Sequence, residues 1–548
     1  MSLNDIVSVA ITRVSSAVTQ QGFSTPLILA YHTRWTSDRV RSYASLDEMV
    51  AAGFTPDDTA HKIAAAVWSQ PNPPSAIKVG RRASAFTKSV RLTPSEANST
   101  VYAVECDGLE ASYTSDSSAT VAEICTGLAA AINALADVDA IIATGGASST
   151  TAQTLSGASL NGASGYRALS PSRRITLTFS SHADWDATTA TITGKDANGT
   201  TITDTIAIPN GGNATVATSK LFARVTSIVI PIQSGTGGTF TAGVAAPWTA
   251  TDDTTHITLA APAGLIPSLE GVSGDLTLED RTTDPGISGD LTAIRAEDDD
   301  WYCALLDSTS SAEILALAAI LEPLTPKKIL VTQSADTACL DSASITDVMY
   351  TVADRDYFRT HVGFYPAIGT VDSWLAPALV GSALAYPPGS VSWVNRELVG
   401  VGDWAPTSSD RSAILGKNGS SIETVAGRKV TFGGKVGGGE WIDIIHGLDW
   451  LRARIAERVF GLIVSAADAK IGFTDKGIAR VHAELRAQLT EAEGAPYNLL
   501  NAGWTTSVPK ASALSSGQRA SRVLPNVTFN ATVQGAIHAV NIAGTVAA

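Results

Sequence analysis

Apolar and polar residues alternate near the C-terminal end of the sequence, in VLPNVTFNATVQGAIHAVNIAGTV at residues 523–546. The alternation holds through Ala539 and resumes in the opposite phase at Val540. A period of two residues is typical of a β-strand with one buried face. A second alternation, at residues 7–12, predicts another strand near the N-terminal end.

Terminal segments tend to fray unless something pairs with them. A sheet can take such strands from its own chain or from a neighbouring copy, and the second case makes a polymer. We expect pairing with a neighbouring copy, in which the apolar residues of both terminal segments pair between subunits. The residues predicted for this inter-subunit strand exchange are Val7, Val9, Ile11, Val527, Phe529, Val533, Ile537, Val540 and Ile542.

Short apolar runs alternate with helical patterns over residues 23–90 and again over residues 248–425. The runs at 26–31 and 301–306 predict buried strands, and the pattern at 311–321 predicts a helix. Strands that alternate with helices favour a mainly parallel sheet. We therefore expect these two stretches to form one α/β body.

Residues 91–247 have a different composition, rich in Thr, Ser, Ala and Gly, with many short alternating runs. Asn198-Gly199 and Gly211-Gly212 are typical of hairpin turns. A single helix is expected at about 120–135. This composition predicts β-rich outer domains inserted into a loop of the α/β body.

Two long helices are predicted toward the C-terminal end. Apolar residues step by three or four through residues 441–464, and a second helix begins at Asp475 and ends near Gly494. The predicted fold class is multidomain α/β and α+β, with extended terminal strands. The expected parts are an N-terminal arm (1–22), the α/β body (23–90 with 248–425), the inserted domains (91–247), a C-terminal α+β assembly domain (426–520) and an arm strand (521–548).

The composition narrows the possible functions. The 548 residues are 44% hydrophobic and only 16% charged, which suits a surface that is largely covered by copies of the same chain. A net charge of -14 argues against nucleic-acid binding. The opening MSLNDIVSVA lacks the basic and apolar regions of a secretion signal, and the apolar stretch 374–386 is broken by Pro377 and Gly381. We expect no membrane insertion.

The four cysteines, Cys106, Cys125, Cys303 and Cys339, form no C-x-x-C pair and have no histidine at zinc-ligand spacing. They are expected to be buried, reduced thiols of a protein made in a cytoplasm. The alternative is that they form disulfides between subunits after release into an oxidising medium.

No catalytic or cofactor motif stands out. There is no G-x-S-x-G sequence, and the glycines at 433–439 do not match a phosphate-binding loop. The acidic run at 297–300 lacks the spacing of a calcium loop. We expect no catalytic residues, no cofactor, no metal site and no enzymatic activity, although a spatial Ser-His-Asp triad is invisible in one sequence.

Several segments, in order along the chain, resemble the tail sheath proteins of contractile-tailed bacteriophages. The clearest is LAYPPGSVSW at 384–393 followed by ELVGV at 397–401, in which Ser392 stands where the family pattern has Thr. The other segments are VSVAITR at 7–13, DDWY at 299–302, VGFY at 362–365, GEWID at 439–443, GLDWL at 447–451 and FTDKG at 473–477. The resemblance covers about residues 1–90 and 295–548 and leaves out the insert.

The resemblance implies a structural subunit of the virion, assembled in the host cytoplasm as a helical or stacked-ring homopolymer around the tail tube. Terminal arms would add strands to sheets of neighbouring subunits. Contraction of the polymer would drive the tube through the host envelope. Besides further copies, the implied partners are the tail tube protein and the baseplate and tail terminator proteins. The alternative is another structural protein of a phage tail or baseplate.

Overall fold

The computed structural model describes residues 20–35, 37–82, 88–135, 142–160, 167–180, 182–261, 267, 269–273, 275–281, 286–366, 373–466 and 470–540. The chain divides into two compact units. We call Ser24–Ala385 with Trp393–Glu440 the body unit. Met1–Phe23, Tyr386–Ser392 and Trp441–Ala548 make up the terminal unit.

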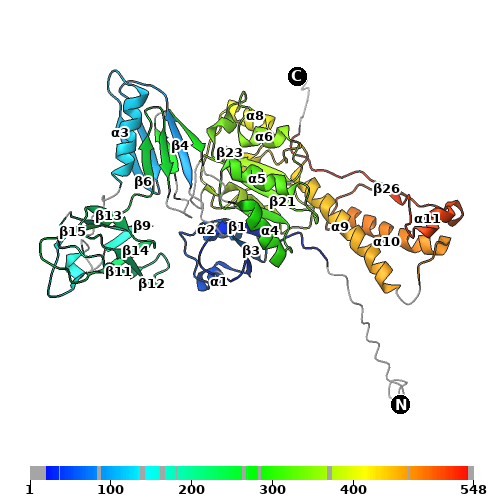
Figure 1. Ribbon diagram of the computed structural model, residues 1–548. Helices are drawn as coiled ribbons and strands as arrows, with labels where there is room; N and C mark the ends of the chain where they lie inside the picture. Colours follow the sequence, from blue (N-terminus) through cyan, green and yellow to red (C-terminus); the bar gives the residue numbers. More distant parts are fainter. Residues whose placement is uncertain are drawn as a thin grey trace, which may run out of the picture. The chain divides into compact units, whose positions relative to one another are not determined.

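The described part of the body unit is built on a six-stranded sheet in the order β2-β3-β1-β20-β21-β22 (Figure 1). Every neighbouring pair is parallel except β2 with β3. The prediction of a mainly parallel sheet is therefore confirmed. The strands are β1 (Pro26–Tyr31), β2 (Val40–Tyr43), β3 (Ile77–Arg82), β20 (Cys303–Leu306), β21 (Ile329–Ser334) and β22 (Thr360–Phe364).

Helices cover the sheet because its strands are apolar on both faces. Leu27 and Leu29 of β1 share a core with α4 (Ile287–Glu297), α5 (Ser311–Leu321) and α6 (Val348–Asp354). Two further helices, α2 (Thr59–Trp68) and α7 (Leu375–Ala383), pack against each other and the sheet. Their contact is close: a Cβ atom on Gly381 would lie 2.2 Å from the carbonyl oxygen of Val67.

Smaller elements complete this part of the body unit. The helix α1 (Leu46–Ala51) lies between β2 and β3 along the chain, α8 (Ser408–Gly416) follows α7, and β23 (Ser421–Val425) forms a hairpin with β24 (Arg428–Phe432). The predicted helix at 311–321 is confirmed as α5 with the same bounds.

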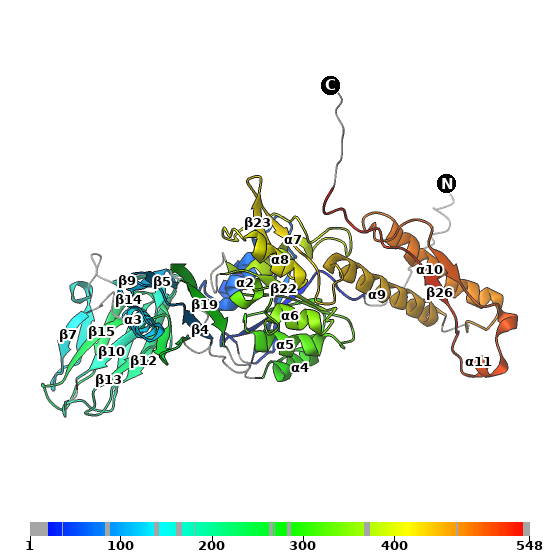
Figure 2. The ribbon, with the colours of Figure 1, turned by 90° about the horizontal axis from the view of Figure 1, so that it is seen from above.

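The insert contains two lobes, each with its own core. In the first lobe, α3 (Val121–Asn133) packs on two antiparallel sheets, and Leu92, Val104 and Leu128 lie in the shared core. Figure 2 shows β4 and β19 of this lobe side by side. Its strands are β4 (Ser89–Pro94), β5 (Val101–Cys106), β6 (Leu109–Thr114), β16 (Thr249–Asp252), β17 (Ile257–Ala260), β18 (Leu269–Ser273) and β19 (Leu276–Asp280).

The second lobe is a sandwich of two antiparallel sheets, whose core includes Phe179, Trp185 and Ile228. The rings of Phe179 and Trp185 meet edge to face at 4.9 Å. The strands are β7 (Ile142–Gly146), β8 (Gln153–Ser156), β9 (Arg167–Arg173), β10 (Ile175–Phe179), β11 (Thr189–Lys195), β12 (Thr201–Ala207), β13 (Ala214–Ala217), β14 (Phe222–Ile230) and β15 (Thr239–Val244).

The extent of the insert differs from the sequence-based division. Strands β16 to β19 pair with β4 and β5, and none of them joins the central sheet. Inserted structure therefore runs from Ser89 to Asp280, whereas the sequence had placed residues 248–280 in the α/β body. The chain enters and leaves an inserted domain at neighbouring points of the host, so the first and last strands of the insert tend to pair, as β4 and β19 do. Such strands are far apart in the sequence, so local patterns do not predict their pairing.

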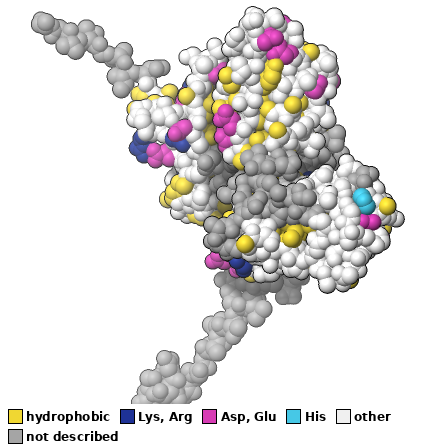
Figure 3. All heavy atoms as spheres, turned by 90° about the vertical axis from the view of Figure 1, so that its left-hand side faces the viewer, with side chains coloured by type: hydrophobic (Ala, Val, Ile, Leu, Met, Phe, Trp, Pro, Cys, Tyr) yellow, Lys and Arg dark blue, Asp and Glu magenta, His cyan; other side chains and the backbone are white. Residues whose placement is uncertain are grey.

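Charged side chains are sparse on the face of the inserted lobes. Figure 3 shows Lys, Arg, Asp, Glu and His side chains there as small separate groups, with hydrophobic side chains between them. This view contains no broad basic patch.

The terminal unit contains the two long helices. The predicted helices are confirmed as α9 (Ile442–Ser465) and α10 (Asp475–Glu493), which pack together. Arg458 of α9 donates to the Gln488 side chain at 2.6 Å and also pairs with Glu491 of α10. The unit also includes β25 (Thr505–Ser507), α11 (Ser516–Ala520) and β26 (Thr528–Asn530).

A buried ionic cluster lies where β1, β3 and β20 end. The Arg82 guanidinium donates to Asp307 at 2.8 Å and to Glu313 at 2.6 Å, and all three side chains are buried. Asp307 also accepts the backbone N–H of Tyr31 at 2.8 Å. Burial raises the pKa of Asp307 and of Glu313, and Arg82 opposes that shift. Arg82 therefore offsets part of the cost of burying these two carboxyl groups.

We predict that Arg82→Met lowers the free energy of unfolding by about 3–5 kcal/mol, because it leaves two buried carboxylates without their cation. Urea unfolding of the full chain, followed by fluorescence, measures the change. The matched control is Arg281→Met, which removes an exposed arginine paired with Glu279 at 3.0 Å. Equal losses in the two variants would show that the buried cluster is not a major contributor to stability.

Candidate strand-exchange site

The C-terminal strand pairs within its own chain. Residues of β26 lie antiparallel to β25, with Thr505 opposite Asn530 and Ser507 opposite Thr528. The pairing continues past the strands, because Gln534 donates its backbone N–H to the carbonyl of Leu499 at 2.9 Å. The expectation that a single chain leaves this segment without a partner is therefore wrong for residues 528–534.

The predicted alternation is confirmed where β26 lies. Thr528, Asn530, Thr532 and Gln534 are exposed, and Val527, Ala531 and Val533 between them are partly buried. Phe529 is the exception on the apolar face, since 44% of its surface is exposed. The chain thus presents one aromatic ring where a half-buried side chain is expected.

The strand itself is shorter than the alternation suggests. Asn526 and Gly535 have φ angles of 57° and 68°, and both values take the backbone out of the extended region. Pro525 adds a residue that cannot donate a ladder hydrogen bond. The predicted strand over residues 523–546 is therefore interrupted on both sides of β26.

The ribbon of β25 and β26 has open edges. In the described part of the chain, neither strand pairs with a third. Their exposed backbone N–H and C=O groups can pair with an additional strand. A two-stranded ribbon is also marginally stable alone in water. The geometry therefore suits β-augmentation, in which an extended segment extends a sheet.

Side chains of α10 and its surroundings position β25. The Thr506 hydroxyl lies 2.6 Å from Nε2 of His482 on α10. Trp504, the residue before β25, donates its indole N–H to Glu493 at 2.7 Å, and the Arg486 guanidinium lies 5.6 Å from the Trp504 ring. The ribbon is thus fixed to the helix pair through β25, and β26 depends on β25.

A histidine holds the segment beyond β26. Nε2 of His538 lies 2.8 Å from the hydroxyl of Ser392, and its ring meets Trp441 at 4.4 Å. Between this contact and β26, Val533 and Gln534 line a hollow of about 90 Å³. Sequence reasoning assigned no role to His538, and no local signal was available because its partner is 146 residues away.

The remaining residues predicted for strand exchange fall into two groups. Ile537 and Val540 are 84% and 70% exposed, so they are available to a partner. Val7, Val9, Ile11 and Ile542 lie outside the described residues. The role of both groups in strand exchange stays a prediction.

The four cysteines are free and buried. Burial raises the pKa of Cys106 to about 12 and of Cys125 to about 11, and it also raises the pKa of Cys303 and Cys339. These thiols are poor nucleophiles in the folded chain. A disulfide between subunits stays a prediction, and it requires the sulfur atoms to be uncovered first.

Besides Ser392 and His538, a second serine–histidine pair has the spacing of a nucleophile and its base. The Ser420 hydroxyl lies 2.7 Å from Nε2 of His361, and Nδ1 of His361 lies 2.7 Å from the carbonyl of Lys435. Burial lowers the pKa of His361 to about 4. Both Ser420 and His361 are buried, so a substrate has no approach to them in this conformation.

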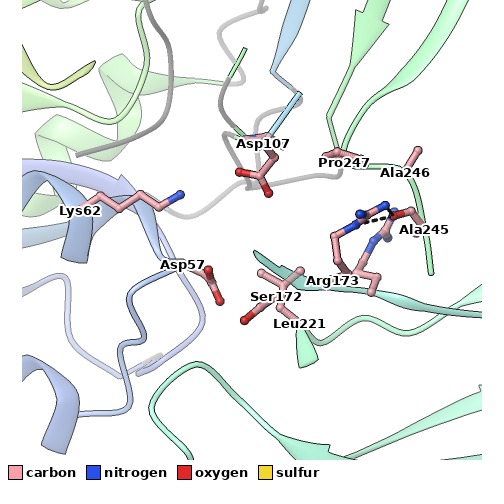
Figure 4. A pocket seen from close by; sticks show the side chains of 11 residues that line it. Asp57, Lys62, Asp107, Ser172, Arg173, Leu221, Ala245, Ala246 and Pro247 are labelled. Carbon is pink, nitrogen blue, oxygen red and sulfur yellow. Dashed lines mark hydrogen bonds between the residues drawn. The ribbon is translucent and has the colours of Figure 1, made fainter. Parts of the chain in front are cut away.

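A pocket of about 40 Å³ in the body unit is a second candidate for chemistry (Figure 4). Asp57, Lys62 and Ser172 line it, and burial raises the pKa of Asp57. Arg173 turns to the carbonyl oxygen of Ala245, to which its Nε donates at 2.9 Å. The pocket offers two acids, Asp57 and Asp107, and basic side chains, but no histidine or cysteine among its lining residues.

Two further features are absent from the residues that the structure describes. No three His, Cys, Asp or Glu side chains are grouped so that they could hold a metal ion. In the same residues, no helix is both long and apolar enough to cross a membrane.

Comparisons with known proteins are weak. No family model and no curated protein matches the sequence. The chain is similar to the crystal structure of a sheath tail protein from Desulfitobacterium hafniense, with 12% identity, coverage of 91% of this chain and 93% of that chain, and a TM-score of 0.39. It is also similar to infectious bursal disease virus VP2, with 15% identity, coverage of 39% and 73%, and a TM-score of 0.10. Neither likeness carries an argument for fold or function.

We predict that His538→Ala loosens the segment after β26. Loss of one hydrogen bond of about 1 kcal/mol corresponds to roughly fivefold faster amide exchange at Gln534 if the bond holds this segment in place. Hydrogen exchange with mass spectrometry of peptides from residues 528–540 measures it. His182→Ala, at an exposed histidine of the body unit, serves as the control. Unchanged exchange in His538→Ala would show that the contact is incidental.

Proposed function

We propose that this chain is a self-assembling structural subunit of a contractile phage tail sheath. It polymerises around a tail tube by exchanging terminal strands, and contraction of the polymer drives the tube through the host envelope. The observation that carries the proposal is the open ribbon of β25 and β26, followed by the exposed Ile537 and Val540. The resemblance of residues 384–401 to sheath proteins supports the same class.

The expected free energies of association favour a polymer, in which every subunit is linked at both ends, over a dimer. An extended segment of about six residues on an open edge gains roughly 0.5–1.5 kcal/mol per backbone hydrogen bond. Full burial of Ile537 and Val540 adds about 1.5–3 kcal/mol each. Association costs on the order of 4–15 kcal/mol, so one arm alone gives a weak link. Arms at both ends of every subunit make the links cooperative.

Strand exchange also suits a lattice that changes shape. Backbone pairing between an arm and its acceptor is local, so it survives a change in the spacing of the subunits. The interruptions at Asn526 and Gly535 divide the C-terminal arm into short pieces that can reorient. We propose that the arms keep neighbouring subunits joined while the lattice shortens.

The proposed surroundings follow from this role. The chain acts in the virion, after assembly in the host cytoplasm, with further copies of itself, the tail tube protein, and the baseplate and tail terminator proteins as partners. Catalysis and cofactors have no part in it. The second candidate is another structural protein of the tail or baseplate, which would form a closed assembly instead of a long polymer.

We predict that deletion of residues 523–548 leaves a soluble, folded monomer that does not polymerise. Sedimentation velocity measures polymerisation, and circular dichroism measures folding. Because deletion also removes β26 from β25, a second variant, Ile537→Asp with Val540→Asp, changes only exposed side chains. The control is Val425→Asp, at an exposed position of β23. Polymers of normal length from the truncated chain would contradict strand exchange.

A further inference from the structure

One face of α9 is covered over its first half and exposed over its last two turns. Residues on this face step by three or four along the helix. His446 and Trp450 are buried, whereas Phe460 and Val464 are 56% and 43% exposed. The residues of this face, which we call the α9 face, are His446, Trp450, Arg454, Glu457, Phe460 and Val464.

The first half of the α9 face is covered by the start of the described chain. Nε2 of His446 lies 3.0 Å from the carbonyl oxygen of Phe23. Arg454 donates to the carbonyl of Gln21 at 3.0 Å, and the backbone N–H of Gln21 donates to Glu457 at 2.8 Å. From Phe23 back to Gln21, the chain therefore runs along α9 toward Phe460 and Val464.

The other side of α9 already has a partner. Arg458 contacts Gln488 and Glu491 of α10, and α10 packs along the helix. The cover of the α9 face stops at Glu457, next to the point where the described chain begins, at Gln20. The segment that precedes Gln20 is therefore the nearest candidate to cover the rest.

The length of the uncovered part of the α9 face matches the length of chain between Gln21 and Val18. Val464 lies seven residues beyond Glu457, which is about 10 Å along a helix. Val18 lies three residues before Gln21, which is also about 10 Å in an extended chain. Val14 and Val18 are four residues apart, so they share one side of an extended segment. A direct continuation of the path brings Val18 to the exposed end of the face.

We propose that residues 14–18 of the same chain dock on the α9 face, with Val18 against Phe460 and Val464. The docked segment covers the exposed apolar side chains and fixes where the N-terminal arm leaves the terminal unit. Residues 1–13, including Val7, Val9 and Ile11, remain available to another subunit. The docking is independent of the proposed sheath function, because it involves one chain alone.

A pair of cysteines tests the docking. The full chain with Val18→Cys and Val464→Cys is oxidised mildly as a dilute mixture of isotope-labelled and unlabelled chains. Its four native cysteines are buried. We expect a disulfide between residues 18 and 464 of the same chain, with a yield that does not change on dilution by about tenfold. The matched control, Val18→Cys with Ala487→Cys, places the second cysteine at an exposed position of α10.

The control should cross-link about tenfold less, because its two sulfur atoms do not share the docked position. Adding Phe460→Asp to the first pair should lower its yield by a similar factor. Disulfides that join labelled to unlabelled chains would overturn the proposal in favour of docking on a second copy. Equal yields in the test pair and the control pair would overturn it in favour of an undocked segment. Neither result depends on whether the chain polymerises.

Discussion

Unsatisfied backbone hydrogen bonding at the edges of a two-stranded ribbon is the constraint on which the terminal unit depends. In the described residues, β25 and β26 pair only with each other, so their outer edges remain open. Such edges lead to aggregation unless a specific partner covers them. Around the ribbon, His482 contacts β25, His538 contacts the segment after β26, and Ile537 and Val540 are exposed.

The body unit, unlike the ribbon of the terminal unit, pairs charged side chains in its interior. Its central sheet has helices packed on it, and Arg82 pairs with Asp307 and Glu313 in the interior. The cluster lies at the ends of β1 and β20, a position at which α/β enzymes commonly bind ligands. The cluster occupies that position with side chains of its own.

Local patterns predicted the helices well, because the apolar spacing and the capping residues that mark a helix lie within the helix or next to it. The bounds of α5 were predicted, and α9 and α10 were placed almost to the residue. What the sequence did not reveal is non-local: the pairing of β16–β19 with β4 and β5, the pairing of β26 with β25, and the contact between His538 and Ser392. Alternation also overestimated the length of the terminal strand, because it does not register the left-handed φ angles at Asn526 and Gly535.

The central claim is that the ends of this chain link copies into a long polymer around a hollow axis. Electron microscopy of the purified full chain, concentrated in physiological salt and imaged in negative stain, tests it most directly. The account predicts striated hollow cylinders whose length varies from particle to particle. Closed particles of fixed size, or single subunits at every concentration, would contradict it.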